Sequence, residues 1–525
     1  MNKRSSIITV TRRKTIISLF LSIILVTGTI ALSFSSSSFI TVDAQADLNL
    51  QITQLTTDEL NFPTGIDFLS ENDILVIEKN TGQVKRILDG KVLKEPVLDV
   101  NVASESERGL LGIAILNTKE GLTNSDITTI NETLQEANNL KNEGEVKVFL
   151  FYTETKDIDN GNILGNRLYK YDFMDGKLVN PKLLLDLPFL PGPAHNGGVL
   201  ELGPDNNLYL VIGDLYLLRE NINHPDYPAY VTLTQNVEAS KLPDGRGGVL
   251  RLTVDGDPVI GNDDGFSSLG RNSGLLNFYY GYGIRNSFGI DFDPVTGILW
   301  ETENGPDYGD EINVILPGFN GGWRQVWGLS TEFENFKTKE FDKSKLISLN
   351  EKTTYYDPVF TWADTVAPTA ITFIDSKIFG EEYENDILVG SANQGGRIFH
   401  FNLNETRTGL DLPPGELVDK MADVDEELEP VIAGRNFGMI TDIEINPYDG
   451  KIYVVSGLDG QSKNGKIYHA YPKPHQQKQQ QQQNSMTELL PQQRTPQQQI
   501  PSSISQEQMH QQQIVKLKQL LDTGR

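Results

Sequence analysis

The chain has 525 residues and a formal net charge of −26, with 47 Gly, 25 Pro and no Cys. This length accommodates two average domains or one large β fold, and the many Gly and Pro residues favour a turn-rich globular β protein. The lack of Cys excludes disulfides, thiolate zinc sites and cysteine nucleophiles. The acidic balance argues against nucleic acid as a partner, because phosphate binding needs a basic surface.

Residues 1–44 are predicted to be an export signal. Basic residues precede the apolar run IISLFLSIILVTGTIALSF, and Val42-Asp43-Ala44 offers a small-residue cleavage site. Because this run of about 19 residues could also span a bilayer uncleaved, an N-terminal membrane anchor is the alternative. We therefore expect the protein to be exported, either extracellular or at the cell surface. A product starting at Gln45 would be four charge units more negative than the full chain.

Between residues 47 and 472 the chain repeats a short apolar strand, in many cases after a polar turn. The clearest strands are NDILVIEK (72–79), KVFLFYTE (147–154), NLYLVIGD (207–214), GILWETEN (297–304), NDILVGSA (385–392) and GKIYVVSG (450–457). Short strands at regular spacing with Gly, Asp and Asn turns predict a closed all-β fold or a propeller. Four strands make a blade, so about 425 residues predict six blades of roughly 70 residues, although seven shorter blades would also fit.

Three segments depart from this pattern. Residues 117–145 are polar and acidic, which indicates a surface insertion. Residues 220–244 form another long connection close after Asp214, and we expect it near the mouth of any central site. Residues 473–525 are rich in Gln and lack the apolar content to build a core, so this tail is predicted to be disordered.

The stretch HNGGVLELGPDNNLYLVIGD, residues 195–214, is typical of a β-hairpin whose turn is GPDNN. Residues equidistant from a hairpin turn lie opposite each other, and His195 and Asp214 are symmetric about the Pro204–Asp205 bond. The pattern therefore places an imidazole beside a carboxylate at the open end of the hairpin. A carboxylate in that place can orient the ring and make it a better general base. On spacing alone, a solvated or structural His in a Gly-rich loop is the more common outcome.

Several familiar active-site patterns are absent from the sequence. It contains no GxSxG elbow, no P-loop, no HExxH and no Rossmann fingerprint after a strand. Three other segments combine residues in a way that a purely structural role would not require. They are SERGLLGIAIL (106–116), YGYGIRNSFGIDFDPVTG (280–297) and ETENGPDYGDEINVILPGFNGGW (301–323).

Together with the hairpin, these segments resemble the soluble quinoprotein glucose dehydrogenase and aldose sugar dehydrogenase family, also called the glucose/sorbosone dehydrogenase family. The resemblance covers about residues 61–471 and includes the ERGLLG, HxGG…GPD…GD, GxRNxxG and ExGPxxxDExN patterns in the family's order. It implies an all-β, six-bladed propeller with pyrroloquinoline quinone (PQQ) over the central channel and a calcium ion beside it. It also implies oxidation of a sugar by hydride transfer to the quinone.

The resemblance assigns roles to particular residues. His195 matches the base that takes the proton from the sugar's anomeric hydroxyl, and Asp214 matches the carboxylate that supports it. Arg285 and Asn286 match the pair that contacts the quinone oxygens. The backbone carbonyls that help to hold calcium match Gly305 and Pro306, and oxygen ligands suit this hard cation. Glu107 stands where some family members have Gln near the cofactor.

The later segments match the family only in part. In TWADTVAPTA (361–370), Trp362 and Thr365 resemble residues that pack against the quinone. The position of the family's cofactor-binding Lys is Asn393, and Met439 and Thr441 hold the places of two Arg before Asp442. Arg397 and Arg435 are near enough in sequence to substitute for the missing cations. These cations normally meet the three carboxylates of PQQ, and the loss of three such partners would cost several kcal/mol, at roughly 1.5–3 kcal/mol each.

The sequence therefore predicts an exported, PQQ- and calcium-dependent enzyme that oxidises an aldose to its lactone and passes electrons to an unknown acceptor. The first alternative is a non-catalytic, calcium-stabilised propeller that binds a glycan or a protein at the cell surface. The second is a calcium-dependent lactonase-type hydrolase, which requires acidic and Asn ligands converging on a metal in the channel.

Overall fold

The described part of the computed structural model consists of β-strands joined by turns and short 3-10 helices. The structure describes residues 43–44, 48, 50–56, 58, 60–117, 146–157, 161–215, 230–260, 274–333, 341–458 and 465–473. Most of the predicted export segment, the insertion after residue 117 and the tail from residue 474 lie outside these residues. None of the helices in the described ranges is long and apolar enough to cross a membrane.

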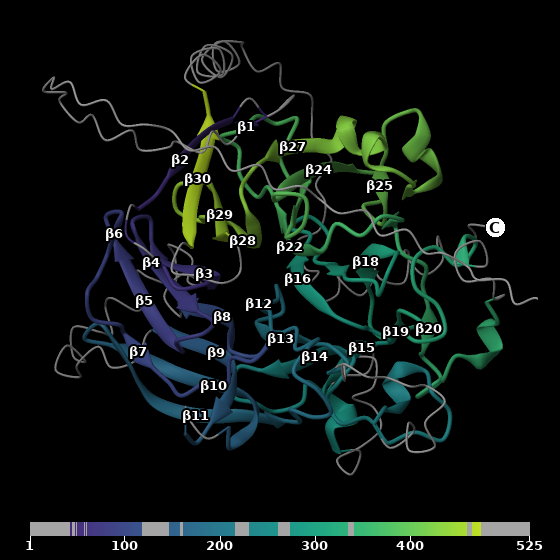
Figure 1. Ribbon diagram of the computed structural model, residues 1–525, viewed down its shortest axis with the longest axis horizontal. Helices are drawn as coiled ribbons and strands as arrows, with labels where there is room; N and C mark the ends of the chain where they lie inside the picture. Colours follow the sequence, from purple (N-terminus) through teal and green to yellow (C-terminus); the bar gives the residue numbers. More distant parts are fainter. Residues whose placement is uncertain are drawn as a thin grey trace, which may run out of the picture. The chain divides into compact units, whose positions relative to one another are not determined.

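The first three sheets follow one another along the chain (Figure 1). The first sheet contains β3 (Pro63–Ser70), β4 (Asp73–Glu78), β5 (Gln83–Leu88), β6 (Lys91–Val92) and β7 (Leu98–Asp99). The second contains β8 (Leu110–Asn117), β9 (Val146–Thr155), β10 (Ile163–Met174) and β11 (Lys177–Leu187). The third contains β12 (Leu200–Leu202), β13 (Asn207–Ile212), β14 (Gly248–Thr253), β15 (Tyr279–Tyr282), β19 (Phe319–Asn320) and β20 (Thr354–Tyr355).

The remaining three sheets include strands from both ends of the described chain. The fourth contains β16 (Ser287–Phe292), β17 (Leu299–Glu303), β18 (Asp310–Ile315), β21 (Phe360–Trp362) and β26 (Met421–Ala422). The fifth contains β22 (Pro368–Phe373), β23 (Ile387–Ser391), β24 (Arg397–Leu403), β25 (Leu410–Asp411), β27 (Ile432–Arg435) and β1 (Asp43–Ala44). The sixth contains β28 (Met439–Ile445), β29 (Ile452–Leu458), β30 (Lys466–Pro472) and β2 (Leu50–Gln54).

Among the described residues, five 3-10 helices lie in the connections between the strands. They are η2 (Leu233–Gln235), η4 (Gly274–Phe278), η5 (Lys343–Lys345), η6 (Glu416–Asp419) and η7 (Asp425–Val431). Of these, η2 belongs to the connection that the sequence placed near the mouth of a central site, and it reaches that site.

The first strands of the six sheets form a closed ring. Each contacts the first strand of the next sheet, in the order β3, β8, β12, β16, β22 and β28, and β28 contacts β3 again (Figure 1). The early strand β2 pairs with β30, so the two ends of the described chain complete one sheet together. The prediction of an all-β propeller is confirmed by this closed arrangement.

The six apolar strands that the sequence marks are the second strands of the six sheets: β4, β9, β13, β17, β23 and β29. Each is almost completely buried, because its sheet packs against neighbours on both faces. A strand buried on both faces is read in the sequence as a continuous apolar run. The large apolar clusters accordingly lie between successive sheets, as for Trp300 with Phe373 and Phe149 with Leu210.

Aspartates on the ring strands connect neighbouring sheets. The carboxylate of Asp67 on β3 accepts the N–H of Ile115 on β8 at 2.6 Å. Asp291 on β16 accepts the N–H of Phe373 on β22 at 2.7 Å, and Asp442 on β28 accepts the N–H of Ile66 on β3 at 2.9 Å. These bonds satisfy backbone donors that a ring of separate sheets would otherwise leave unpaired.

Candidate functional site

The predicted site residues lie at one end of the ring because of the strand order. The first two strands of each sheet are antiparallel neighbours, so the residues before the first strand and after the second lie at the same end. Glu107, His195, Asn286 and Thr365 precede the first strands β8, β12, β16 and β22. Asp214, Gly305 and Asn393 follow the second strands β13, β17 and β23.

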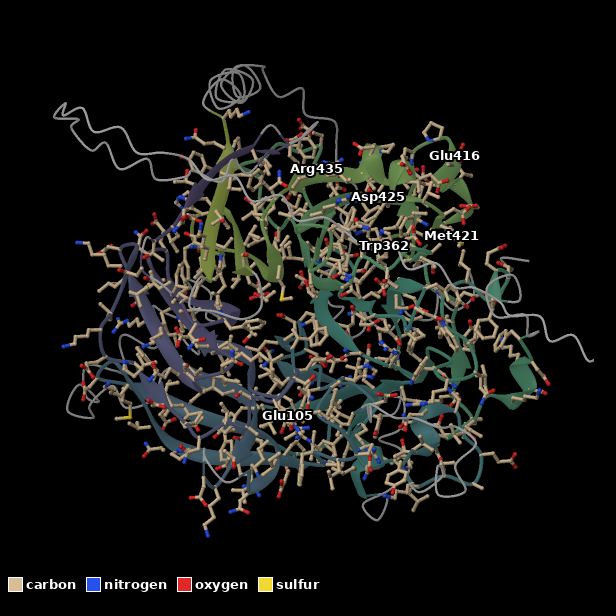
Figure 2. All side chains as sticks on the ribbon, viewed as in Figure 1. Glu105, Trp362, Glu416, Met421, Asp425 and Arg435 are labelled. Carbon is tan, nitrogen blue, oxygen red and sulfur yellow. The ribbon has the colours of Figure 1, made fainter. Side chains whose placement is uncertain are left out.

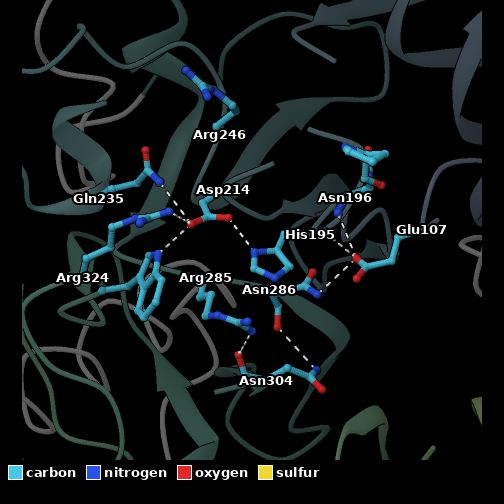
Figure 3. Close-up of polar contacts among 12 residues, drawn as sticks. Glu107, His195, Asn196, Asp214, Gln235, Arg246, Arg285, Asn286, Asn304 and Arg324 are labelled. Carbon is cyan, nitrogen blue, oxygen red and sulfur yellow. Dashed lines mark hydrogen bonds and ion pairs between the residues drawn. The ribbon is translucent and has the colours of Figure 1, made fainter. Parts of the chain in front are cut away.

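His195 and Asp214 are in direct contact, as the hairpin pattern predicted. Nδ1 of His195 lies 2.6 Å from Oδ1 of Asp214, and both side chains are buried (Figure 3). The predicted centre of the hairpin was wrong by half a residue, because Leu200 pairs with Leu210 and Leu202 with Leu208, which centres the turn on Asp205.

The backbone partner of His195 is consequently Leu215, whose N–H donates to the His195 carbonyl at 3.4 Å. His195 has a φ of +58° and Leu215 one of +54°, so the ladder is irregular at its open end. The contact between imidazole and carboxylate therefore depends on the left-handed backbone conformations of His195 and Leu215. Gly213 is required between the strands, because a Cβ there would lie 2.5 Å from the His195 carbonyl oxygen.

Asp214 is held by three further donors. Its Oδ2 accepts hydrogen bonds from Arg324 Nη2 at 2.6 Å, Trp323 Nε1 at 2.9 Å and Gln235 Nε2 at 3.2 Å (Figure 3). Burial alone would raise the pKa of Asp214, but the positive charge of Arg324 and the hydrogen bond from His195 hold it well below its usual range. Asp214 is therefore an ionised carboxylate, so Nδ1 of His195 carries the proton and Nε2 carries the lone pair.

Arg285 and Asn286 extend from the loop between β15 and β16 into the same region. The backbone N–H of Arg285 donates to Glu303 Oε1 at 2.7 Å, and its Nη1 donates to the Asn304 carbonyl at 2.6 Å. Asn286 Nδ2 donates to Glu107 Oε2 at 3.2 Å. Within the described residues, the Oδ1 atom of Asn286 is buried without a hydrogen-bond partner. A buried acceptor of this kind is costly unless a bound molecule satisfies it.

Glu107 links the histidine and asparagine loops. Besides Asn286, its Oε2 accepts the backbone N–H of His195 at 2.6 Å and that of Asn196 at 3.3 Å. A carboxylate with three donors is firmly placed, so Glu107 fixes the backbone on which the imidazole is mounted.

A cavity of about 600 Å3 lies at this end of the ring. Its lining includes seven predicted residues, which are His195, Glu107, Arg285, Asn286, Gly305, Thr365 and Asn393. Met439, Thr441 and Asp442, in the segment that departs from the family pattern, also line it. Most ligand pockets have volumes of about 300–1,000 Å3, so the cavity can hold a cofactor-sized molecule. Asp214 supports the cavity from behind His195 and is not part of its lining.

Two predicted contacts are corrected by the structure. Trp362 is completely buried in the core between the fourth and fifth sheets, where its ring lies 4.9 Å from that of Phe360 and 5.5 Å from that of Phe399. It does not line the cavity, because β21 is separated from the ring strand β16 by β17 and β18 and is buried on both faces. Pro306 is exposed and also lies outside the lining, unlike its neighbour Gly305.

Arg397 and Arg435 do not supply the missing cations. Arg397 donates through both terminal nitrogens to Asp425, and Arg435 Nη2 donates to Glu429 Oε2 at 2.6 Å. Neither arginine lines the cavity. Figure 2 shows Arg435 and Asp425 in the region of β24 and β27, toward the outer part of the fifth sheet. The positive charges of both arginines are therefore paired with carboxylates outside the cavity.

Several polar residues of the site were not predicted. Arg324, Gln235 and Lys79 are the main ones: the first two hold Asp214, and the third lines the cavity. Trp323 ends a segment that the sequence had marked and Arg324 follows it directly, but no pattern paired them with Asp214. Lys79 ends a predicted strand, and its position just after the second strand of a sheet was the signal that could have identified it.

The described residues contain no group of three or more His, Cys, Asp or Glu side chains that could hold a metal ion. The lactonase-type alternative requires such a group in the channel. Gly305, the cavity-lining member of the predicted calcium pair, donates its N–H to Asp310 Oδ1 at 2.8 Å.

Comparisons with known proteins identify a family and relatives that this chain resembles. The family model for glucose/sorbosone dehydrogenase matches residues 136–469, more than half of the chain. The chain is 27% identical over 389 residues to aldose sugar dehydrogenase YliI of Escherichia coli, an alignment that covers 70% of this chain and 89% of the relative. It is 27% identical over 316 residues to quinoprotein glucose dehydrogenase B of Acinetobacter calcoaceticus, covering 56% of this chain and 59% of that protein.

A solved structure shares the fold. The PQQ-bound form of an aldose sugar dehydrogenase from Streptomyces coelicolor superimposes with a TM-score of 0.52 at 21% identity, over 82% of this chain and 99% of that one. The sequence motifs, the closed ring of sheets and the matching family model lead to one conclusion. The chain belongs to the glucose/sorbosone dehydrogenase family and is an oxidoreductase that acts on CH–OH groups.

Proposed function

We propose that the protein oxidises an aldose to its lactone with PQQ as the hydride acceptor, and that each of the six sheets is one blade of its propeller. The observation that carries the enzymatic part is the buried His195–Asp214 pair at a cavity lined by Arg285 and Asn286. An ionised carboxylate that fixes the tautomer of an imidazole is the arrangement that a general base requires. The family assignment and the names of the relatives support the same reaction class.

The residues of the cavity fit a quinone cofactor. The Arg285 guanidinium would donate to the quinone oxygens, and the unpartnered acceptor atom of Asn286 marks a place where a hydrogen-bond donor of a bound group is needed. Thr365 and Asn393 would border the ring system. When bound, PQQ supplies a carbonyl carbon that accepts a hydride from the sugar.

A residue of the chain itself would accept the proton that the sugar loses. Nε2 of His195 would take the proton of the anomeric hydroxyl, because Asp214 keeps the other ring nitrogen protonated. The imidazolium formed in this step is stabilised by the ionised Asp214 carboxylate, 2.6 Å away. Arg285, which lines the cavity, would stabilise the negative charge that develops on a bound acceptor. Arg324 and Gln235 hold Asp214 so that the ring keeps its orientation.

Calcium belongs to the same proposal. The carbonyl of Gly305, which lines the cavity, would supply one hard oxygen ligand, and the ion would polarise the acceptor. Since the described side chains offer no metal-binding group, most ligands would be backbone oxygens or bound molecules. Extensive dialysis against a calcium chelator is expected to lower activity, and added calcium should restore it. Activity that is unaffected by complete calcium removal would eliminate the ion from the proposal.

We also propose that the protein is exported, on the basis of the sequence of residues 1–44. Asp43–Ala44 forms β1, an edge strand on β27, so cleavage after Ala44 would remove this strand. Cell fractionation and N-terminal sequencing of the mature protein distinguish a cleaved signal from an uncleaved anchor. The anchor would attach the protein to a membrane.

One experiment tests the catalytic proposal. The purified protein is incubated with PQQ and calcium, binding is followed by quinone absorbance, and dye reduction is measured with a panel of aldoses. Binding at micromolar PQQ together with aldose-dependent dye reduction is the expected result. Absence of PQQ binding would refute the dehydrogenase and favour the glycan- or protein-binding propeller, for which the neutral residues Asn393, Met439 and Thr441 are the supporting observation.

A further inference from the structure

Lys79 directly follows the second strand β4 of the first sheet, where Ala392, the residue before Asn393, directly follows β23 of the fifth. Lys79 and Asn393 therefore lie one residue apart in equivalent loops, at the same end of the ring. The family resemblance puts a cofactor-binding Lys at Asn393, where this chain has a neutral amide. Lys79 lines the same cavity.

The side chain of Lys79 is buried, with 7% of the residue exposed. Its Nζ donates to Asn80 Oδ1 at 3.1 Å and to the Ser104 carbonyl at 3.4 Å, and both acceptors are neutral. No carboxylate among the described residues forms an ion pair with this ammonium. Burial lowers the pKa of Lys79 to about 8, and the more distant charge of Glu107 opposes that shift. An ammonium that is buried and not neutralised is costly unless a bound anion compensates it.

The ring of Phe62 lies between this ammonium and the segment that lacks cations. Nζ lies 5.4 Å from the centre of the Phe62 ring. A Cβ placed on Gly457 would lie 3.6 Å from Phe62 Cε2 and 3.5 Å from Thr441 Cγ2, so the Phe62 ring and the Thr441 side chain border the same spot. Thr441 also donates to the Pro63 carbonyl at 2.9 Å. Lys79 is thus one aromatic ring away from a position where the family has Arg.

The loop around Gly109 is shaped to accommodate the lysine. A Cβ on Gly109 would lie 2.5 Å from Lys79 Cγ and 2.4 Å from the Lys79 carbonyl oxygen. Gly109 has a φ of +151°, and its neighbour Leu110 donates its N–H to the Lys79 carbonyl at 3.0 Å. Glycine is therefore needed in the ERGLLG segment so that the stem of Lys79 can pass beside it.

We propose that Lys79 binds a carboxylate of the anionic ligand in this cavity, and so supplies positive charge that Asn393, Met439 and Thr441 do not. This inference rests on the proposed function, because it takes PQQ, a tricarboxylate, as the ligand. The ammonium and the carboxylate would form a charge-assisted pair inside the cavity. Affinity for the ligand, rather than the chemical step, is the quantity that Lys79 controls.

The test compares equilibrium binding of PQQ to the wild type, Lys79→Gln, Lys79→Arg and Lys91→Gln. Lys91 is an exposed residue on β6 of the same sheet, so its substitution changes the net charge equally. Lys79→Gln is expected to weaken PQQ binding by about tenfold to one-hundredfold, the effect of losing one charge-assisted bond. Lys79→Arg should retain most of the affinity, and Lys91→Gln should bind like the wild type.

A quinone without carboxylates, 9,10-phenanthrenequinone, provides the second measurement. Its affinity should be the same in the wild type and in Lys79→Gln. Equal PQQ affinity in Lys79→Gln and Lys91→Gln overturns the inference and leaves the proposed function intact, whereas a wild type that does not bind PQQ overturns the proposed function itself. If Lys79→Gln does not fold, reductive methylation of the wild type followed by peptide mass spectrometry decides: PQQ should protect Lys79, and equal labelling with and without PQQ overturns the inference.

Discussion

The two sides of the cavity are built in different ways. On the side of the third and fourth sheets, His195, Arg285 and Asn286 stand in a dense network, with Asp214 alone receiving four side-chain contacts. On the side of the fifth and sixth sheets, Asn393, Met439 and Thr441 are neutral. A site can therefore keep the geometry of its reacting groups while the charges that bind the ligand come from another part of the ring. Lys79 is our candidate for that source.

Replacing the base should have the largest effect. His195→Gln is expected to lower kcat for aldose oxidation by about 100- to 10,000-fold, the usual contribution of a general base. Steady-state dye reduction measures this change. His400→Gln is the matched control, because His400 Nε2 also lies 2.9 Å from a carboxylate, that of Asp386, but His400 does not line the cavity. Aldose oxidation that persists at the wild-type rate in His195→Gln would remove His195 from the mechanism.

Removing the central carboxylate should have the next largest effect, on stability. Asp214→Asn leaves Arg324 facing a neutral amide in a buried place, which is expected to cost about 3–5 kcal/mol. Urea unfolding measures the difference. In the control Asp425→Asn, the carboxylate paired with Arg397 is 42% exposed, so a loss of about 0–1 kcal/mol is expected. A similar small loss in both variants would show that the Asp214 network does not stabilise the fold.

Arg285→Met tests whether the side of the cavity formed by the third and fourth sheets contributes to PQQ affinity. Loss of the guanidinium is expected to weaken PQQ binding by about 1.5–3 kcal/mol, since hydrogen bonds to charged groups contribute about that much. Titration followed by quinone absorbance measures the affinity. Arg435→Met removes an arginine that is paired with Glu429 outside the cavity, and it should bind PQQ like the wild type. Unchanged affinity in Arg285→Met would mean that the quinone does not contact this side.

Supplying a cation on the neutral side should strengthen binding. Asn393→Lys is expected to raise PQQ affinity by about tenfold, or roughly 1.4 kcal/mol, because it adds one charge-assisted partner inside the cavity. Gln394→Lys adds the same charge to the next residue, which does not line the cavity, and should change the affinity little. An equal gain in both variants would indicate a general electrostatic effect in place of a specific contact.

A further expected effect is a pH dependence of stability from the ring aspartates. Burial raises the pKa values of Asp67, Asp291 and Asp442 from 3.8 to about 7. Such groups bind more protons in the folded state, so their stabilising contribution is complete below about pH 4 and is lost as the pH rises to about 7. Urea unfolding between pH 4.5 and 7.5 should show a falling free energy of unfolding.

A matched variant isolates this contribution. Asp442→Asn keeps the shape of the side chain and removes its ionisation, so the free energy of unfolding should fall less steeply with pH in this variant. An identical slope in the variant and the wild type would contradict the assignment.

Much of the fold was predictable because each sheet contains one strand that is buried on both faces. These strands, such as β4 and β13, are continuous apolar runs in the sequence. The remaining strands were not identified individually, since strands such as β11 alternate between buried and exposed residues or, like β6 and β19, contain only two residues. The motifs around His195, Arg285 and Gly305 identified the family for a similar reason, because each is a continuous segment.

Contacts between distant segments were decided only by the tertiary structure. Arg324 lies 110 residues from Asp214, and Asp442 lies 376 residues from Ile66, so no local pattern links either pair. Trp362 shows the converse: its sequence context suggested a ligand contact, but β21 is an outer strand of the fourth sheet, where the Trp362 ring packs in the core.

The sequence by itself determined the class of fold, the family and the identity of the histidine–carboxylate pair, because these are properties of short continuous segments. Which charges surround the ligand was decided by the closing of the ring, which brings the ends of six separate sheets together. Lys79 and Thr441, which belong to different sheets, line the same cavity for that reason.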